Sequence, residues 1–223
     1  AVDAEGSASR LRPFTGAAAP APAAPRRVAD VPRTLAGVGR RIALTFDDGP
    51  DPTYTPKILR VLREHHAPAT FFVCGENAEW QPDLLRAIRD EGHLLANHTW
   101  SHPQLDLLSR AEVRDELGRT SDVVARAVGR APRLARAPYG VWDEPSLRVC
   151  AELGMRPLGW SVDSDDWTRP GADRIAATLL DGAHPGAVAL AHDGGGDREQ
   201  TVAALRACLP RLLDRGFEPV LPG

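Results

Sequence analysis

The feature that most constrains the fold is a regular alternation of short β-type runs with helix-period segments from Arg40 onward. Strands are predicted where apolar and β-branched residues cluster, and helices where apolar residues recur every three to four positions. A capping-box pair, Ser109 and Glu112, predicts the start of one helix. The predicted strands are 42–46, 70–73, 93–96, 133–135, 157–161, 187–191 and 217–220, and the predicted helices are 55–65, 82–91, 110–128, 144–153, 172–180 and 201–215. This alternation indicates a parallel sheet, either a β/α barrel or an open doubly wound sheet.

Polar clusters follow five of the predicted strands. In chain order they are Asp47–Asp48, Asn97–His98, Arg136, Asp163–Asp166 and His192–Asp193. A β/α barrel collects its active-site residues from several loops at the carboxyl ends of its strands, whereas an open sheet concentrates them near one switch point. Because five loops contribute here, the pattern favours the barrel.

The first 35 residues differ from the rest of the chain. The stretch GAAAPAPAAPRRVADVPRT is rich in alanine and proline and has no hydrophobic period, so we expect residues 1–35 to form a tail or linker. Residues 36–223 then form one domain, which is long enough to bury a stable core without the help of disulfides or structural metal ions. No signal peptide is evident, but a secreted protein whose signal has been cleaved could begin in this way.

Charge and cysteine content narrow the possible partners. The net charge is -3 and there is no basic block, so we expect no nucleic-acid partner. No apolar run reaches the length of about 18 residues that a transmembrane helix needs. The three cysteines, Cys74, Cys150 and Cys208, form no C-x-x-C pair. Buried thiols are the simplest interpretation, and one disulfide with a free thiol remains an alternative.

A metal site is predicted from two histidines and a pair of aspartates. His98 and His102 are spaced i, i+4, so on one helical turn their rings would face the same side. With Asp48 as a third ligand, such a site leaves coordination positions open for water and substrate. Metal binding would neutralise the charge of Asp48, so its neighbour Asp47 could stay ionised and take a proton from water as a general base.

Five short motifs resemble those of a known family. In chain order they are TFDDGP (Thr45–Pro50), HTWSH (His98–His102), RAPYG (Arg136–Gly140), DSDDW (Asp163–Trp167) and LAHD (Leu190–Asp193). Together they resemble the motifs of the NodB-homology polysaccharide deacetylases, carbohydrate esterase family 4, over about Arg40 to Val220. The resemblance implies a distorted (β/α)7 barrel. Two positions depart from the usual pattern, with Ala137 where many relatives have proline and Ala191 where leucine is common.

The resemblance also implies a metal centre and a catalytic base. Asp48, His98 and His102 would hold a divalent metal, usually zinc and sometimes cobalt. Asp47 would be the base, and Arg136 would pair with it and keep it ionised.

A second group of implied roles concerns the leaving group and the substrate. His192 would be the general acid that protonates the departing amine, and Asp166 would hold it by a hydrogen bond, with Asp163 as the alternative partner. The backbone N–H of Tyr139 would stabilise the oxyanion. Trp167 and Leu190 would shape the acetyl pocket.

The expected function is therefore removal of N-acetyl groups from a glycan, with N-acetylglucosamine units of peptidoglycan or chitin-type oligomers as leading substrates. An O-acetyl esterase acting on xylan, a deacetylase of a small metabolite and a carbohydrate-binding module without turnover are the alternatives. We expect a monomer that is secreted or associated with the cell envelope. Trp100 and Trp142, in predicted rim loops, are candidates for sugar contacts, whereas Trp160 is expected in the core.

Overall fold

The sheet of the computed structural model, which describes residues 29–37 and 39–223, is built from parallel strands. Its strands are β1 (Arg41–Asp47), β2 (Thr70–Val73), β3 (Leu94–Asn97), β4 (Leu134–Ala135), β5 (Arg156–Pro157), β6 (Val162–Asp163), β7 (Ala187–His192) and β8 (Glu218–Pro219). Seven of them follow the order β5-β4-β3-β2-β1-β7-β6, and β8 pairs with the start of β1. The predicted distorted (β/α)7 barrel in a single domain is confirmed.

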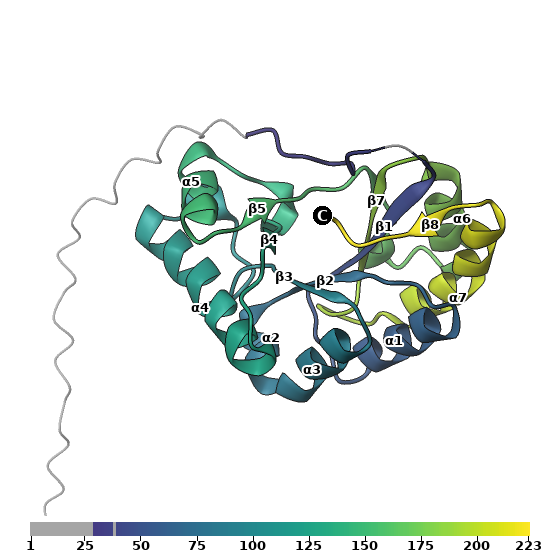
Figure 1. Cartoon of the computed structure of the whole chain (residues 1–223), viewed down its shortest axis with the longest axis horizontal. Helices are drawn as coiled ribbons and strands as arrows, with labels where there is room; N and C mark the ends of the chain where they lie inside the picture. Colours follow the sequence, from purple (N-terminus) through teal and green to yellow (C-terminus); the bar gives the residue numbers. More distant parts are fainter. Residues whose placement is uncertain (1–28, 38) are drawn as a thin grey trace, which may run out of the picture.

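Helices cover the outside of this curled sheet (Figure 1). They are α1 (Tyr54–Glu64), α2 (Gly75–Trp80), α3 (Pro82–Asp90), α4 (Arg110–Val128), α5 (Glu144–Glu152), α6 (Ala172–Gly182) and α7 (Glu199–Asp214), with 3-10 turns η1 (Leu105–Leu107), η2 (Pro138–Gly140) and η3 (Asp166–Thr168). The capping box of Ser109 and Glu112 is confirmed at the start of α4. Helix α2 was not predicted, because its six residues are too few to show a helical period.

Two apolar layers lie on opposite faces of the sheet. Inside the barrel, small and medium side chains from several strands meet, among them Ala43, Phe72, Ala96, Leu134 and Val188. Between sheet and helices, the apolar faces of α1, α3, α6 and α7 pack on the outward side chains of the central strands. This alternation of faces along each strand sets the direction in which the residues at the strand ends point.

The predicted strand 157–161 was wrong as a single element. Its first residue belongs to β5, which pairs with β4, while β6 begins after it and pairs with β7. No ladder joins β5 to β6 within the described chain, so the barrel is open along this seam. The side chain of Arg136 reaches the seam from inside and donates hydrogen bonds to the carbonyls of Leu158 (3.1 Å) and Gly159 (2.8 Å).

Residues 29–35 lie against the open seam. Ala29 N–H donates to Trp142 O (2.7 Å), Gly159 N–H donates to Pro32 O (2.8 Å), and Thr34 forms an antiparallel bridge with Ala187. This part of the segment predicted as tail or linker therefore contacts the barrel, while residues 1–28 lie outside the described residues.

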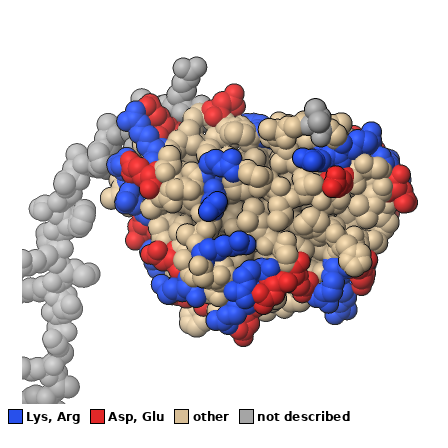
Figure 2. All heavy atoms as spheres, in the orientation of Figure 1, with Lys and Arg blue, Asp and Glu red and all other residues tan. Residues whose placement is uncertain are grey.

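The chain end crosses the opposite mouth of the barrel from the polar clusters. Val220 N–H donates to Ile42 O at the start of β1, and Arg156 donates to the carbonyl of Gly223. Figure 2 shows this face, with basic and acidic side chains interspersed around its edge and further basic ones over β3, β4 and β5. None of the helices in the described ranges is long and apolar enough to span a membrane.

Candidate functional site

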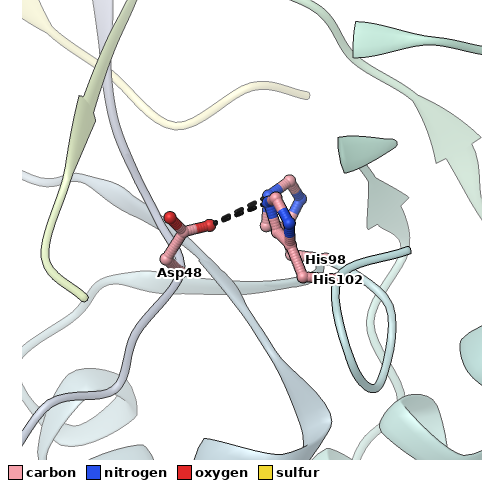
Figure 3. Close-up of side chains that lie close together, drawn as sticks. All are labelled: Asp48, His98 and His102. Atoms are coloured by element: carbon pink, nitrogen blue, oxygen red, sulfur yellow. Dashed lines mark ion pairs between the residues drawn. The ribbon is translucent and has the colours of Figure 1, made fainter. Parts of the chain in front are cut away.

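Asp48, His98 and His102 converge on one point at the carboxyl ends of the strands (Figure 3). Asp48 follows β1, and His98 follows β3. Asp48 Oδ1 lies 3.3 Å from His98 Nε2 and 3.3 Å from His102 Nε2. The predicted helical turn over 98–102 was wrong, since these residues form a loop with φ of 70° at Thr99 and 63° at His102. The two rings nevertheless meet edge to face, with centroids 5.0 Å apart.

The three side chains fit a bound cation. Asp48 Oδ1 is buried and accepts no hydrogen bond. His98 Nδ1 lies 2.8 Å from the carbonyl oxygen of Arg136, so this nitrogen carries a proton and Nε2 presents its lone pair to Asp48. A carboxylate and imidazole nitrogens aimed at one point are the donor set of a zinc-type or related divalent ion. The group can therefore hold a metal ion.

The pKa shifts of His98 and Asp48 also favour positive charge at this point. Burial disfavours the charged form of His98, but the negative charges of Asp47 and Asp48 outweigh it and raise its pKa. Burial likewise opposes ionisation of Asp48, yet its interactions with His102 and His98 lower its pKa well below the usual range. The cluster thus attracts positive charge, which a proton or a metal ion can supply.

Asp47 is buried and paired with a buried arginine. Arg136 Nη1 donates to Asp47 Oδ1 at 2.8 Å, and the same nitrogen donates to Thr45 Oγ1 at 2.8 Å. The guanidinium also lies 4.0 Å from the centre of the Phe72 ring. Its Nε and Nη2 are held by the seam carbonyls, so the guanidinium is fixed and holds the carboxylate of Asp47 in one orientation.

His192 forms the other side of the site. Its Nδ1 lies 2.6 Å from Asp166 Oδ1, and its backbone N–H donates to Asp166 Oδ2 at 2.8 Å. Thr201 Oγ1 donates to the same Oδ2 at 2.7 Å. Burial disfavours the charged imidazole, but Asp166 outweighs burial and raises the pKa of His192 to about 9. Asp163, the alternative partner, instead accepts from Trp160 Nε1 at 3.1 Å.

A pocket of about 400 Å³ joins these groups. Asp47 and His192 line it together with Asp48, His98, His102, Tyr139, Trp167 and Leu190. Tyr139 and Trp167 are 65% and 60% exposed, so their rings flank the opening. Two further predicted residues, Arg136 and Asp166, lie buried behind the lining.

Two of the tryptophans contradict the expectation drawn from the sequence. Trp100 and Trp142, predicted candidates for sugar contacts, are only 7% and 1% exposed and belong to the apolar clusters. Trp160, expected in the core, packs against the apolar cluster inside the barrel, and it also lines the pocket. It stands in the irregular backbone between β5 and β6.

Thr45 and Thr201 were not singled out from the sequence. Thr45 stands two residues before Asp47 on the same face of β1, and this period-two spacing is a signal that could have identified it. Thr201 bonds a residue 35 positions away, and no local pattern reveals such a contact.

Cys74, Cys150 and Cys208 are buried free thiols.

Comparisons with known proteins agree with this geometry. Residues 36–158 match the family model described as polysaccharide deacetylase. The chain is 46% identical over 191 residues to a chitooligosaccharide deacetylase from Bradyrhizobium sp. (strain ANU 289), an alignment covering 80% of this chain and 87% of that one.

Solved structures give the same answer. The Bc1960 peptidoglycan N-acetylglucosamine deacetylase, in complex with 4-naphthalen-1-yl-N-oxidanyl-benzamide, has a TM-score of 0.82 and 39% identity, covering 85% of this chain and 89% of that one. A family 4 carbohydrate esterase from Streptomyces lividans, in complex with acetate, has a TM-score of 0.77 and 34% identity, covering 83% and 94%. The resemblance seen in the five motifs is thereby confirmed, and the chain belongs to the polysaccharide deacetylase family, carbohydrate esterase family 4.

Proposed function

We propose that the chain hydrolyses the N-acetyl groups of N-acetylglucosamine units in a glycan of the peptidoglycan or chitin type. The observation that carries this proposal is a single pocket lined by a carboxylate paired with a buried arginine, an Asp-His-His group and an imidazole held by a carboxylate. Amide hydrolysis needs a base for water, a sink for negative charge and an acid for the departing amine. The names of the relatives support the same substrate class.

Asp48, His98 and His102 would hold the metal. A divalent cation at this position supplies Lewis acidity toward the substrate carbonyl and lowers the pKa of water near it. We propose zinc as the resident ion, with cobalt as a working substitute, because one carboxylate and two imidazoles suit both. Metal analysis of the purified protein, and reloading of chelated protein with each ion, test this choice.

Asp47 would act as the general base. It takes a proton from water as the water oxygen bonds to the carbonyl carbon, and its contact with Arg136 holds the carboxylate in one orientation. The backbone N–H of Tyr139 would donate to the tetrahedral oxygen.

His192 would then complete the reaction. With its pKa raised to about 9, its imidazole is protonated at neutral pH, and Asp166 fixes the ring through Nδ1. As the C–N bond breaks, the Nε2 proton passes to the nitrogen, giving a free amine and acetic acid, which loses its proton to solvent and leaves as acetate. Solvent then returns a proton to His192 and removes the one on Asp47. Trp167 and Leu190 would enclose the acetyl methyl.

Acetate release tests the proposal. The purified chain would be assayed on chitooligosaccharides, peptidoglycan and acetylxylan, each after exhaustive chelation and after zinc or cobalt is added back. We expect metal-dependent release from one of the two N-acetylated glycans. Release from acetylxylan alone would identify an O-acetyl esterase. Glycan retention on a column without any release would identify a binding module, and turnover of small acetylated metabolites alone would point to a tailoring enzyme.

We also propose that the protein acts outside the cytoplasm, in secreted form or at the cell envelope, because wall polymers and chitin lie there. Fractionation of cells followed by immunodetection tests this location. Size-exclusion chromatography with light scattering tests the expected monomer.

A further inference from the structure

The loop that carries His102 has an unfavourable backbone. Thr99 and His102 adopt φ of 70° and 63°, in the left-handed region that side chains with a Cβ rarely occupy. Such backbone conformations are unfavourable, so the surrounding structure has to hold the loop in place. The contacts that hold it also decide where the His102 ring lies.

Hydrogen bonds from several neighbouring residues satisfy most of the loop's backbone N–H and C=O groups. Thr99 N–H donates to Asn97 Oδ1 at 2.8 Å, and His102 N–H donates to Thr99 Oγ1 at 3.2 Å. At the start of α2, Gly75 and Glu76 donate N–H to the carbonyls of Thr99 (2.9 Å) and Trp100 (3.2 Å). Two backbone N–H groups, those of Trp100 and Ser101, remain for a partner from outside.

Glu116 is that partner. Its carboxylate reaches across from α4, and Oε2 accepts the N–H of Trp100 and the N–H of Ser101, each at 2.8 Å. Oε1 accepts the hydroxyl of Ser101, also at 2.8 Å. One ionised side chain therefore satisfies three donors in the two residues that precede His102. Hydrogen bonds to a charged acceptor are stronger than neutral ones.

The Trp100 ring makes this contact rigid. It is buried beneath the guanidinium of Arg119, 3.8 Å from the ring centre, and packs against Gly75, where an added Cβ would come within 2.3 Å of the ring. Close packing of the ring on Gly75 therefore opposes movement of the loop toward α2.

His98 is held independently of Glu116. It directly follows β3, its N–H donates to Val73 O at 3.0 Å, and its ring is fixed by the carbonyl of Arg136. Beyond its own loop, His102 has the edge-to-face contact with the exposed Tyr139 ring, with centroids 5.0 Å apart. Of the two histidines, His102 thus depends more on the loop.

We propose that Glu116 is a positioning residue for the metal site, which holds the loop 99–102 so that His102 Nε2 faces Asp48. This inference rests on the proposed function, in that it requires the Asp-His-His group to bind a cation. Loss of a partner that orients a metal ligand typically weakens metal affinity by about 10–100-fold.

The test is a zinc titration of metal-free protein in competition with a chromogenic chelator. Glu116→Ala should raise the zinc dissociation constant by about 10–100-fold. Glu116→Gln should restore most of the affinity, because its amide oxygen still accepts both N–H groups. Ser101→Ala removes only the hydroxyl contact and should cost less than Glu116→Ala. The visible absorption spectrum of the Co²⁺-loaded protein should change in Glu116→Ala, since it reports ligand geometry.

A matched control lies one turn away on the same helix. Glu112 bonds Ser109 in the capping box and makes none of the loop's hydrogen bonds, so Glu112→Ala should lower the unfolding temperature and leave zinc affinity unchanged. Zinc affinity within twofold of wild type in Glu116→Ala overturns the proposal while leaving the metal site intact. If that variant fails to fold, Glu116→Asp takes its place: its shorter side chain draws the carboxylate back from the N–H groups of Trp100 and Ser101, so zinc binding should weaken, and zinc affinity within twofold of wild type there also overturns the proposal. Wild-type protein that binds no zinc or cobalt would instead refute the metal site itself.

Discussion

The two sides of the pocket are built in different ways. On the acid side, Asp166 accepts from the His192 ring, the His192 backbone and Thr201, so its charge is fully met by protein groups. On the metal side, Asp48 Oδ1 is buried without a hydrogen bond and faces two imidazole nitrogens. The first side is complete as folded, whereas the second needs a cation. Removing parts of the two sides should therefore have unequal consequences.

The largest effect is expected from Asp48→Ala. This change removes the only carboxylate of the Asp-His-His group, so zinc binding should be lost, and deacetylation should fall by about 10³-fold or more, since charge stabilisation alone is worth about 10²–10³ in rate. Metal content by elemental analysis and acetate release measure the two losses. Asp51→Ala in the same loop is the control, because Asp51 bonds the N–H groups of Thr53 and Tyr54 and should affect only stability. Full zinc content in Asp48→Ala would contradict the ligand assignment.

Asp47→Asn should separate chemistry from metal binding. Without a base, kcat should fall by about 10²–10⁴-fold, because general-base catalysis contributes about that much. The zinc content should stay at the wild-type level, since the role proposed for Asp47 is to accept a proton from water. If the variant loses its metal instead, the roles of the two adjacent aspartates are reversed.

His192→Asn should cost less than either aspartate and should depend on the leaving group. We expect a loss of about 10²-fold on N-acetyl substrates, because an amine needs a proton to leave, and a smaller loss on O-acetyl esters. In the wild type, kcat/KM should fall as pH rises through about 9, where His192 loses the proton that it donates. This basic limb should disappear in the variant. A similar loss on amides and esters would show that His192 does not protonate the leaving group.

The positions of the site residues could be predicted from the sequence, but the backbone of the loop that carries His102 could not. Residues at strand ends were predictable, because alternating strands and helices bring all the carboxyl ends to one rim. The sequence alone therefore predicts that Asp48, His98 and His192 lie near one another. The backbone of the 98–102 loop was not predictable, since its left-handed residues depend on partners in α2 and α4 rather than on its own sequence.

One further error lies at the seam of the barrel. Residues 157–161 have the composition of a buried strand, but they lie between β5 and β6, which do not pair, and Trp160 there both packs on the inner cluster and lines the pocket. The hydrophobic periodicity of a sequence indicates which face of a strand or helix is apolar, but it does not indicate which strands pair. Trp142 was also misplaced, because it lies in an apolar cluster built from residues distant in the sequence, against which Ala29 and Val31 pack.

Thr201→Val tests the completeness of the acid side and should have the smallest effect. It removes one of three donors to Asp166, so the free energy of unfolding should fall by about 1.5–3 kcal/mol, as for other hydrogen bonds to charged groups. The contact between Asp166 and the His192 ring remains, so kcat should drop by less than tenfold and zinc affinity should not change; Thr201→Ser should restore both stability and kcat. Calorimetry, steady-state kinetics and zinc titration measure the three quantities. If kcat instead falls as far as in His192→Asn, the ring depends on Thr201 for its position, and the acid side is no more self-sufficient than the metal side.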